Sequence, residues 1–158
     1  MNKTELLGRW TKEKSEELYG INNWGAGYFS ISEKGEVTVN PYKNNDAASV
    51  SIMDIISGVQ ERGLDMPVLL RFENLLDTQI AYLNDSFAEA MNKLNYKGVY
   101  RGVYPIKVNQ QKHVVEEITK FGQHYHHGLE VGSKAELIAA LSLIKDKEAC
   151  IICNGYKD

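Results

Sequence analysis

The spacing of apolar and polar positions divides the chain into a β-rich first part and an alternating second part. Two short runs rich in aromatic and β-branched residues, 25–31 and 36–39, are joined through Glu33-Lys34-Gly35. A Gly-containing connection of this length is typical of a β-hairpin. A polar linker rich in asparagine follows around 40–46. The pattern therefore predicts an N-terminal β segment and linker over residues 1–45.

Beyond the linker, helical periodicity and short apolar runs take turns. Apolar positions over 52–59 fall on one helical face, and Gly63 is placed to end that helix. We then expect strands at 67–72, 98–106, 128–132 and 149–153, with helices over 76–94, 114–121 and 137–144 between them. Such alternation predicts parallel strands joined by crossover helices, and hence an α/β fold. The series ends on a strand without its following helix, so we expect the chain to be truncated.

Composition and charge agree with an ordinary globular protein. The chain has 158 residues, of which 43% are hydrophobic and 25% charged, and its net charge is −3. This balance argues against a nucleic-acid-binding protein, which would show a clustered basic face. No apolar run approaches the roughly 20 residues of a membrane span. The first residues lack the apolar core of a signal peptide. We therefore predict a cytoplasmic protein without nucleic-acid or membrane partners.

Two groups of residues have the composition of metal or redox sites. Cys150 and Cys153 have C-x-x-C spacing, but in a strand residues three apart point to opposite faces, and no second ligand pair has zinc spacing. Two strand residues are the favoured interpretation. The run from His124 to His127 contains three histidines, but adjacent residues diverge, so it is interpreted as a polar loop.

Two further features have simple structural interpretations. The aromatic residues Trp10 and Trp24 are expected to pack in the core of the β segment rather than to form a binding surface. Ser133 and Glu136 have the S-x-x-E spacing of a capping box and are expected to begin the helix that follows.

The candidate chemistry lies at the carboxyl ends of the predicted strands, where α/β proteins gather their reactive groups. Three such ends are 107–111, 130–133 and 154–158. Lys107 lies between the apolar Ile106 and Val108, so its amine is expected to be partly desolvated. Desolvation lowers the pKa of a lysine and suits it to attack a carbonyl. By itself, the same pattern also fits a solvated surface lysine.

Several motifs that occur in a fixed order along the chain make the assignment of Lys107 more specific. They are EELYGI (16–21), WGAGYF (24–29), PVLLRF (67–72), RGVYPIKVNQQ (101–111), GLEVGSKAEL (128–137) and IICNGYKD (151–158). Together they resemble the biosynthetic arginine decarboxylases, which belong to the alanine-racemase-like group of pyridoxal-phosphate enzymes. The resemblance covers nearly the whole chain, and the linker is its least distinctive part.

The resemblance implies a site and a reaction. Lys107 would hold pyridoxal 5'-phosphate as a Schiff base and exchange it for the α-amine of L-arginine. Loss of CO2 would then give agmatine, a step in arginine catabolism toward polyamines such as putrescine and spermidine. Glu130 aligns with an acidic residue that lies close to the cofactor in the related ornithine decarboxylases. The family also implies a homo-oligomer and a magnesium requirement, although no residue here is recognisable as a magnesium ligand.

The resemblance also implies an incomplete fold. Residues 46–158 would form the first strands and helices of a TIM-type (β/α)8 barrel, and residues 1–45 would join a β-domain completed elsewhere. The phosphate-binding loop and the substrate-selecting acids come later in the family's chain, so the isolated chain is expected to be inactive. Two alternatives remain open at this point: another enzyme of the group (a racemase, or a decarboxylase of ornithine, lysine or diaminopimelate), or a non-catalytic domain.

Overall fold

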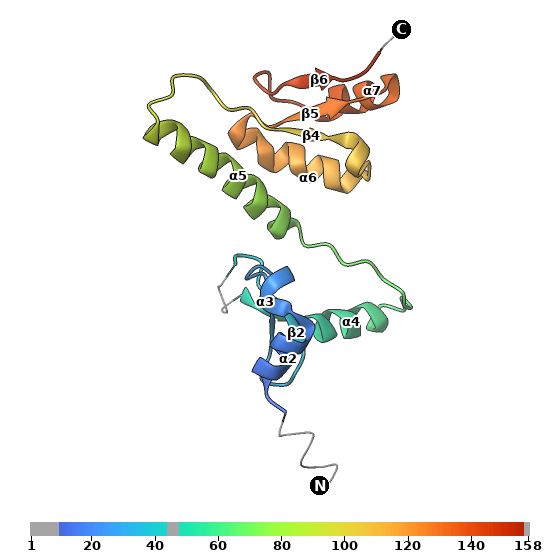
Figure 1. Cartoon of the computed structure of the whole chain (residues 1–158). Helices are drawn as coiled ribbons and strands as arrows, with labels where there is room; N and C mark the ends of the chain where they lie inside the picture. The colour runs from blue at the N-terminus through green and yellow to red at the C-terminus, as the bar shows by residue number, and fades with distance from the viewer. Residues whose placement is uncertain (1–9, 44–47, 157–158) are drawn as a thin grey trace. The chain divides into compact units, whose positions relative to one another are not determined.

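The computed structural model describes residues 10–43 and 48–156 and divides the chain into two compact units, Met1–Leu75 and Leu76–Asp158. Figure 1 shows the elements of both. The last part of the predicted linker, 44–46, lies outside the described residues. The helix predicted over 52–59 belongs to the first unit, together with the hairpin. None of the helices in the described ranges is both long and apolar enough to cross a membrane.

The first unit is built on the predicted hairpin. β1 (Phe29–Ile31) pairs antiparallel with β2 (Val37–Val39), which also pairs with the short β3 (Val50–Ser51). Gly35, in the turn, has a φ of +83°, a conformation that glycine adopts without a steric penalty. The hairpin prediction is confirmed.

Two helices precede the hairpin, and the apolar pattern did not predict them. α2 (Lys12–Tyr19) begins at Thr11, whose side chain accepts a hydrogen bond from the backbone N–H of Lys14. The left-handed Gly20 separates it from α3 (Ile21–Trp24). No residue of α2 is buried. Because it has no apolar face, α2 leaves no periodic signal in the sequence, and capping at its ends defines it instead.

The expected core packing of the two tryptophans is wrong. Trp10 and Trp24 are 52% and 56% exposed, whereas Tyr28 is buried. Each indole N–H donates a hydrogen bond to a residue of α2. Trp10 donates to the Ser15 hydroxyl at 2.7 Å, and Trp24 donates to the Tyr19 carbonyl at 3.0 Å. A Trp side chain suits a position where part of the ring is covered and the polar N–H can be hydrogen-bonded, as both indoles are here.

The helix after the linker is confirmed, and the strand after it is not. α4 (Ile52–Glu61) begins at the N-cap Ser51 and packs against β2 and β3, and Gly63 follows its end with a φ of +76°. The segment 67–72 forms no strand. A strand exists only through its ladder of hydrogen bonds, and within the described residues no strand pairs with this segment. Leu69 is 72% exposed there.

The second unit confirms the predicted parallel α/β pattern. The strands β4 (Val103–Pro105), β5 (Gly128–Val131) and β6 (Ile151–Cys153) form a parallel sheet in sequence order. α6 (Lys112–Gly122) and α7 (Lys134–Leu143) cross between successive strands, and α5 (Glu73–Lys93) lies mostly in this unit ahead of β4. Short 3-10 turns, η2 (Ile106–Val108) and η3 (Gln123–Tyr125), follow β4 and α6.

The core of this unit determines which side chains lie on each face of the sheet. Leu129 and Val131 of β5 are fully buried and cluster with Ile106, Val115 and Ala140, which lie in η2, α6 and α7. Because successive strand residues point to opposite faces, Glu130 lies on the face away from this cluster.

Candidate active site

The two residues singled out by sequence lie at the carboxyl ends of adjacent parallel strands. β4 ends at Pro105, and Lys107 lies in η2 directly after it. Pro105 is in register with Glu130 of β5. Neighbouring strands lie about 4.8 Å apart, so the backbone positions of Lys107 and Glu130 belong to one edge of the sheet. The predicted strand-end location of Lys107 is confirmed.

The expected desolvation of Lys107 is wrong for this chain. The lysine side chain is exposed, and so is the following Val108, which is 70% exposed. Of the two apolar neighbours only Ile106 is buried, at 3% exposed. The 3-10 turn explains this difference, because it directs Ile106 into the core and lets the next two residues face solvent. Lys107 is therefore an accessible primary amine.

Glu130 is only partly exposed and carries an unsatisfied acceptor. Its carboxylate oxygen Oε1 is buried and has no hydrogen-bond partner among the described residues. Leaving a buried charged oxygen without a partner costs free energy, which a donor placed there would recover. At this strand end Glu130 therefore has an acceptor that no donor among the described residues uses.

The loop that carries Lys107 is shaped by two hydrogen bonds within its own segment. The Tyr104 hydroxyl donates to the carbonyl of Asn109 at 3.3 Å. The Asn109 side-chain oxygen accepts from the backbone N–H of Gln111 at 3.0 Å, immediately before α6 begins. These bonds curve the chain from the end of β4 into the first turn of α6.

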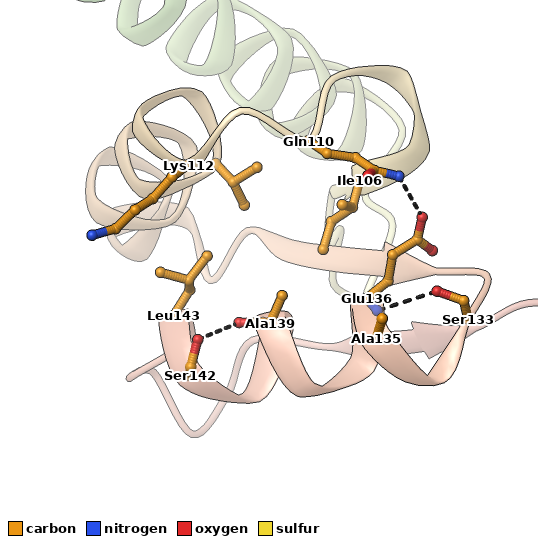
Figure 2. Close-up of a pocket in the computed structure, with 10 residues that line it drawn as sticks. Ile106, Gln110, Lys112, Ser133, Ala135, Glu136, Ala139, Ser142 and Leu143 are labelled. Carbon is orange, nitrogen blue, oxygen red and sulfur yellow. Dashed lines mark hydrogen bonds between the residues drawn. The ribbon is translucent and has the colours of Figure 1, made fainter.

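A third side chain at this edge, Glu136, was predicted only as part of a helix cap. The cap is confirmed, because the Ser133 hydroxyl accepts from the N–H of Glu136 at 3.2 Å. In addition, Glu136 accepts from the N–H of Gly132 at 2.6 Å and from the side-chain amide of Gln110 at 2.9 Å. Figure 2 shows Gln110 and Glu136 facing each other at one end of a pocket of about 350 Å³ between α6 and α7. Gln110 lies 26 residues before Glu136, so sequence spacing gave no signal of this contact.

The third predicted strand end carries less information. Asn154 donates its N–H to the carbonyl of Val131, which continues the pairing of β6 with β5. Lys157 and Asp158 lie outside the described residues. The cysteines in and before β6 are free thiols. The described ranges contain no group of three or more His, Cys, Asp or Glu side chains arranged to hold a metal ion.

The histidine run is a polar loop only in part. His126 is within 2.7 Å of the Asp146 carboxylate. The hydrogen bond from the backbone N–H of Glu148, and then this contact with His126, hold the pKa of Asp146 below its ordinary value. His127, in contrast, is 7% exposed, and burial lowers its pKa because it disfavours the charged imidazole. A methyl group on Gly102 would come within 2.4 Å of the His127 ring, and one on Gly122 within 2.7 Å of its Cβ. Two glycines therefore make the slot for this ring, a pairing that the sequence pattern did not reveal.

Comparisons with known proteins bear on this arrangement. No family model matches the chain. The chain is 50% identical over 149 residues to the biosynthetic arginine decarboxylase of Gloeobacter violaceus. The aligned segment covers 94% of this chain and 23% of that protein. The chain is 46% identical to the enzyme of the same name from Thermosynechococcus vestitus, with the same coverage. The chain is similar to biosynthetic arginine decarboxylases.

A solved structure agrees with the sequence comparison. The crystal structure of the biosynthetic arginine decarboxylase from Campylobacter jejuni matches 89% of this chain with a TM-score of 0.80 and 38% identity. The match covers 23% of that chain. The resemblance inferred from the motifs is thus confirmed, and the chain spans about a quarter of the length of the arginine decarboxylases that it matches.

Proposed function

We propose that this chain is the N-terminal portion of a biosynthetic arginine decarboxylase, which converts L-arginine to agmatine and CO2 with pyridoxal 5'-phosphate as cofactor. The observation that carries the proposal is similarity over 94% of the chain to proteins of this one name. The match to a solved structure at a TM-score of 0.80 supports it from the fold. The chain's own contribution to the reaction is Lys107, with Glu130 beside it.

The residues at the strand ends fit this cofactor. An aldehyde-bearing cofactor needs an accessible primary amine, and Lys107 is exposed at the end of β4. It also needs donors and acceptors that orient its ring, and Glu130 has a buried oxygen without a partner. When bound, pyridoxal phosphate supplies a ring that accepts the electron pair left behind by the departing carboxylate. Lys107 would hold the cofactor through its amine, and Glu130 would offer an acceptor to orient it.

The same proposal gives the second unit its place in a larger fold. Three parallel strands in sequence order, with crossover helices between them, are what consecutive units of a (β/α)8 barrel provide. In such a barrel the face of the sheet that carries Glu130 lines the interior, and the segment 67–72 forms a further strand once its neighbours are present. Residues 1–45 join a β-domain that other parts of the longer protein complete.

Several properties of the longer protein follow from this family and stay predictions. They are a location in the cytoplasm, a homo-oligomeric state, a role in polyamine synthesis and a dependence on magnesium. The isolated chain is predicted to be inactive, because a closed barrel requires strands that this chain does not contain.

The test is a substitution of Lys107 in the complete protein. Lys107→Ala and Lys107→Arg are expected to abolish the formation of agmatine from arginine, since neither side chain offers an amine that can hold the aldehyde. Lys120→Ala is the matched control, because Lys120 is an exposed lysine on α6 that pairs at 3.5 Å with Glu117 of the same helix. Agmatine production that survives Lys107→Ala would overturn the proposal.

A further inference from the structure

Glu136 connects the loops that follow two neighbouring strands. One carboxylate oxygen accepts from the N–H of Gly132, in the loop after β5, and the other accepts from the side chain of Gln110, in the loop after β4. The loop after β4 also carries Lys107. We propose that Glu136 is a positioning residue that holds the loop of Lys107 against the end of β5. This inference rests on the proposed function, in which Lys107 is the cofactor lysine.

The contacts of Glu136 go beyond those of a helix cap. In the usual capping box the acid at this position returns to the backbone N–H of the N-cap residue. Here its Oε2 binds the N–H of Gly132, one residue before the N-cap Ser133, at 2.6 Å. Its Oε1 remains available and accepts from Gln110 at 2.9 Å (Figure 2). The Ser133 hydroxyl already caps α7 by accepting a hydrogen bond from the N–H of Glu136, so the bond to Gln110 is not needed for capping.

The loop of Lys107 benefits from an external attachment. Lys107 and Val108 are exposed, so core packing does not fix their side chains. The bonds from Tyr104 to Asn109 and from Gln111 to Asn109 hold this segment to itself. The bond from Gln110 instead holds it to Glu136 in the first turn of α7, five residues beyond Val131 at the end of β5. Glu130 lies on that same strand, so Glu136 fixes the two site residues relative to each other.

A loosened loop is expected to slow the chemical step more than the binding of arginine. Glu136→Ala removes both bonds, and in the complete protein we expect kcat to fall about tenfold, since small misplacements of a reacting group lower rates by one to two orders of magnitude. The KM for arginine is expected to change less than twofold. Gln110→Ala, which removes the same link from the other side, is expected to lower kcat by a similar factor.

An exchange of the two side chains tests the link itself. Gln110→Glu alone places two carboxylates together and is expected to lower kcat at least as far as Glu136→Ala. Adding Glu136→Gln restores a donor–acceptor pair and leaves an oxygen for the N–H of Gly132, so the double variant is expected to recover most of the lost kcat. Glu116→Ala is the control, because it removes a partly exposed carboxylate that pairs with Lys112 within α6 and leaves the loop attachment intact.

Hydrogen exchange gives a readout that does not depend on activity or cofactor. In the cofactor-free protein, the amides of 106–111 and of Gly132 are expected to exchange several-fold faster in Glu136→Ala than in the unaltered protein or in Glu116→Ala. Unchanged exchange, or a kcat that the double exchange fails to recover, would overturn the positioning role. Failure of the proposed function is distinguishable, because it would appear as full activity in Lys107→Ala.

Discussion

Gly128 is the position at which the parallel sheet leaves no room for a side chain. A methyl group built on Gly128 would lie 1.9 Å from the backbone oxygen of Cys150, just before β6. That oxygen accepts the N–H of Leu129 at 3.0 Å. Ordinary contact between such atoms begins at 3.4 Å, so Gly128→Ala requires the two strands to move about 1.5 Å further apart at this point. At that separation the hydrogen bond from Leu129 is broken.

The expected loss of stability follows from these two effects. Forcing an extra methyl group into a packed site costs typically 1–3 kcal/mol, and losing one backbone hydrogen bond costs about 1 kcal/mol more. We expect Gly128→Ala to lower the free energy of unfolding of the second unit by about 2–4 kcal/mol, a large part of the stability of a small domain. Because β5 carries Glu130, the same change displaces this proposed site residue.

The assay is denaturant unfolding of the 158-residue chain combined with hydrogen exchange at the Leu129 amide. Gly58→Ala in α4 is the control, because a methyl group at Gly58 meets no atom within 4 Å. Replacing a helical glycine there is expected to stabilise the first unit by roughly 0.5–1 kcal/mol. A loss below about 1 kcal/mol in Gly128→Ala, with unchanged protection of Leu129, would show that the strands accommodate the methyl group at this close approach.

Two other predictions concern His127 and Ser133. The pKa of His127 is below its ordinary value because the ring is buried, so the unfolded chain binds more protons and stability falls as the pH drops below about 6.5. His127→Gln should therefore reduce the pH dependence of the free energy of unfolding between pH 7 and 5. An unchanged pH dependence would contradict this cause. Ser133→Ala removes the hydroxyl that caps α7 and should destabilise the protein by about 1 kcal/mol, seen as a lower melting temperature by circular dichroism. An unchanged melting temperature would show that Glu136 alone is enough to cap the helix.

The features that could be predicted from the sequence are those fixed by local chemistry. The hairpin at β1 and β2 depends on a short Gly-containing turn between β-branched runs, and α7 begins at the N-cap Ser133. The alternation of strands and helices from β4 to β6 follows from the change of apolar period, which needs no knowledge of distant contacts.

The features that could not be predicted depend on non-local partners. The run 67–72 has the composition of a strand, but a strand forms only beside another strand, and the described residues offer it none. The burial of Lys107 was inferred from apolar neighbours in sequence, whereas burial depends on what packs over the loop in space. The bond from Gln110 to Glu136 joins residues from separate loops, so it became visible only when both strand ends were placed.

Covalent mapping asks whether Lys107 is the lysine that holds the cofactor in the complete protein. The complete protein is incubated with pyridoxal 5'-phosphate, reduced with borohydride and digested, and the modified lysines are identified by mass spectrometry. We expect modification to concentrate on Lys107, with the exposed lysines of α6, such as Lys112 and Lys120, modified far less. Modification spread evenly over surface lysines, with no preference for Lys107, would contradict this assignment.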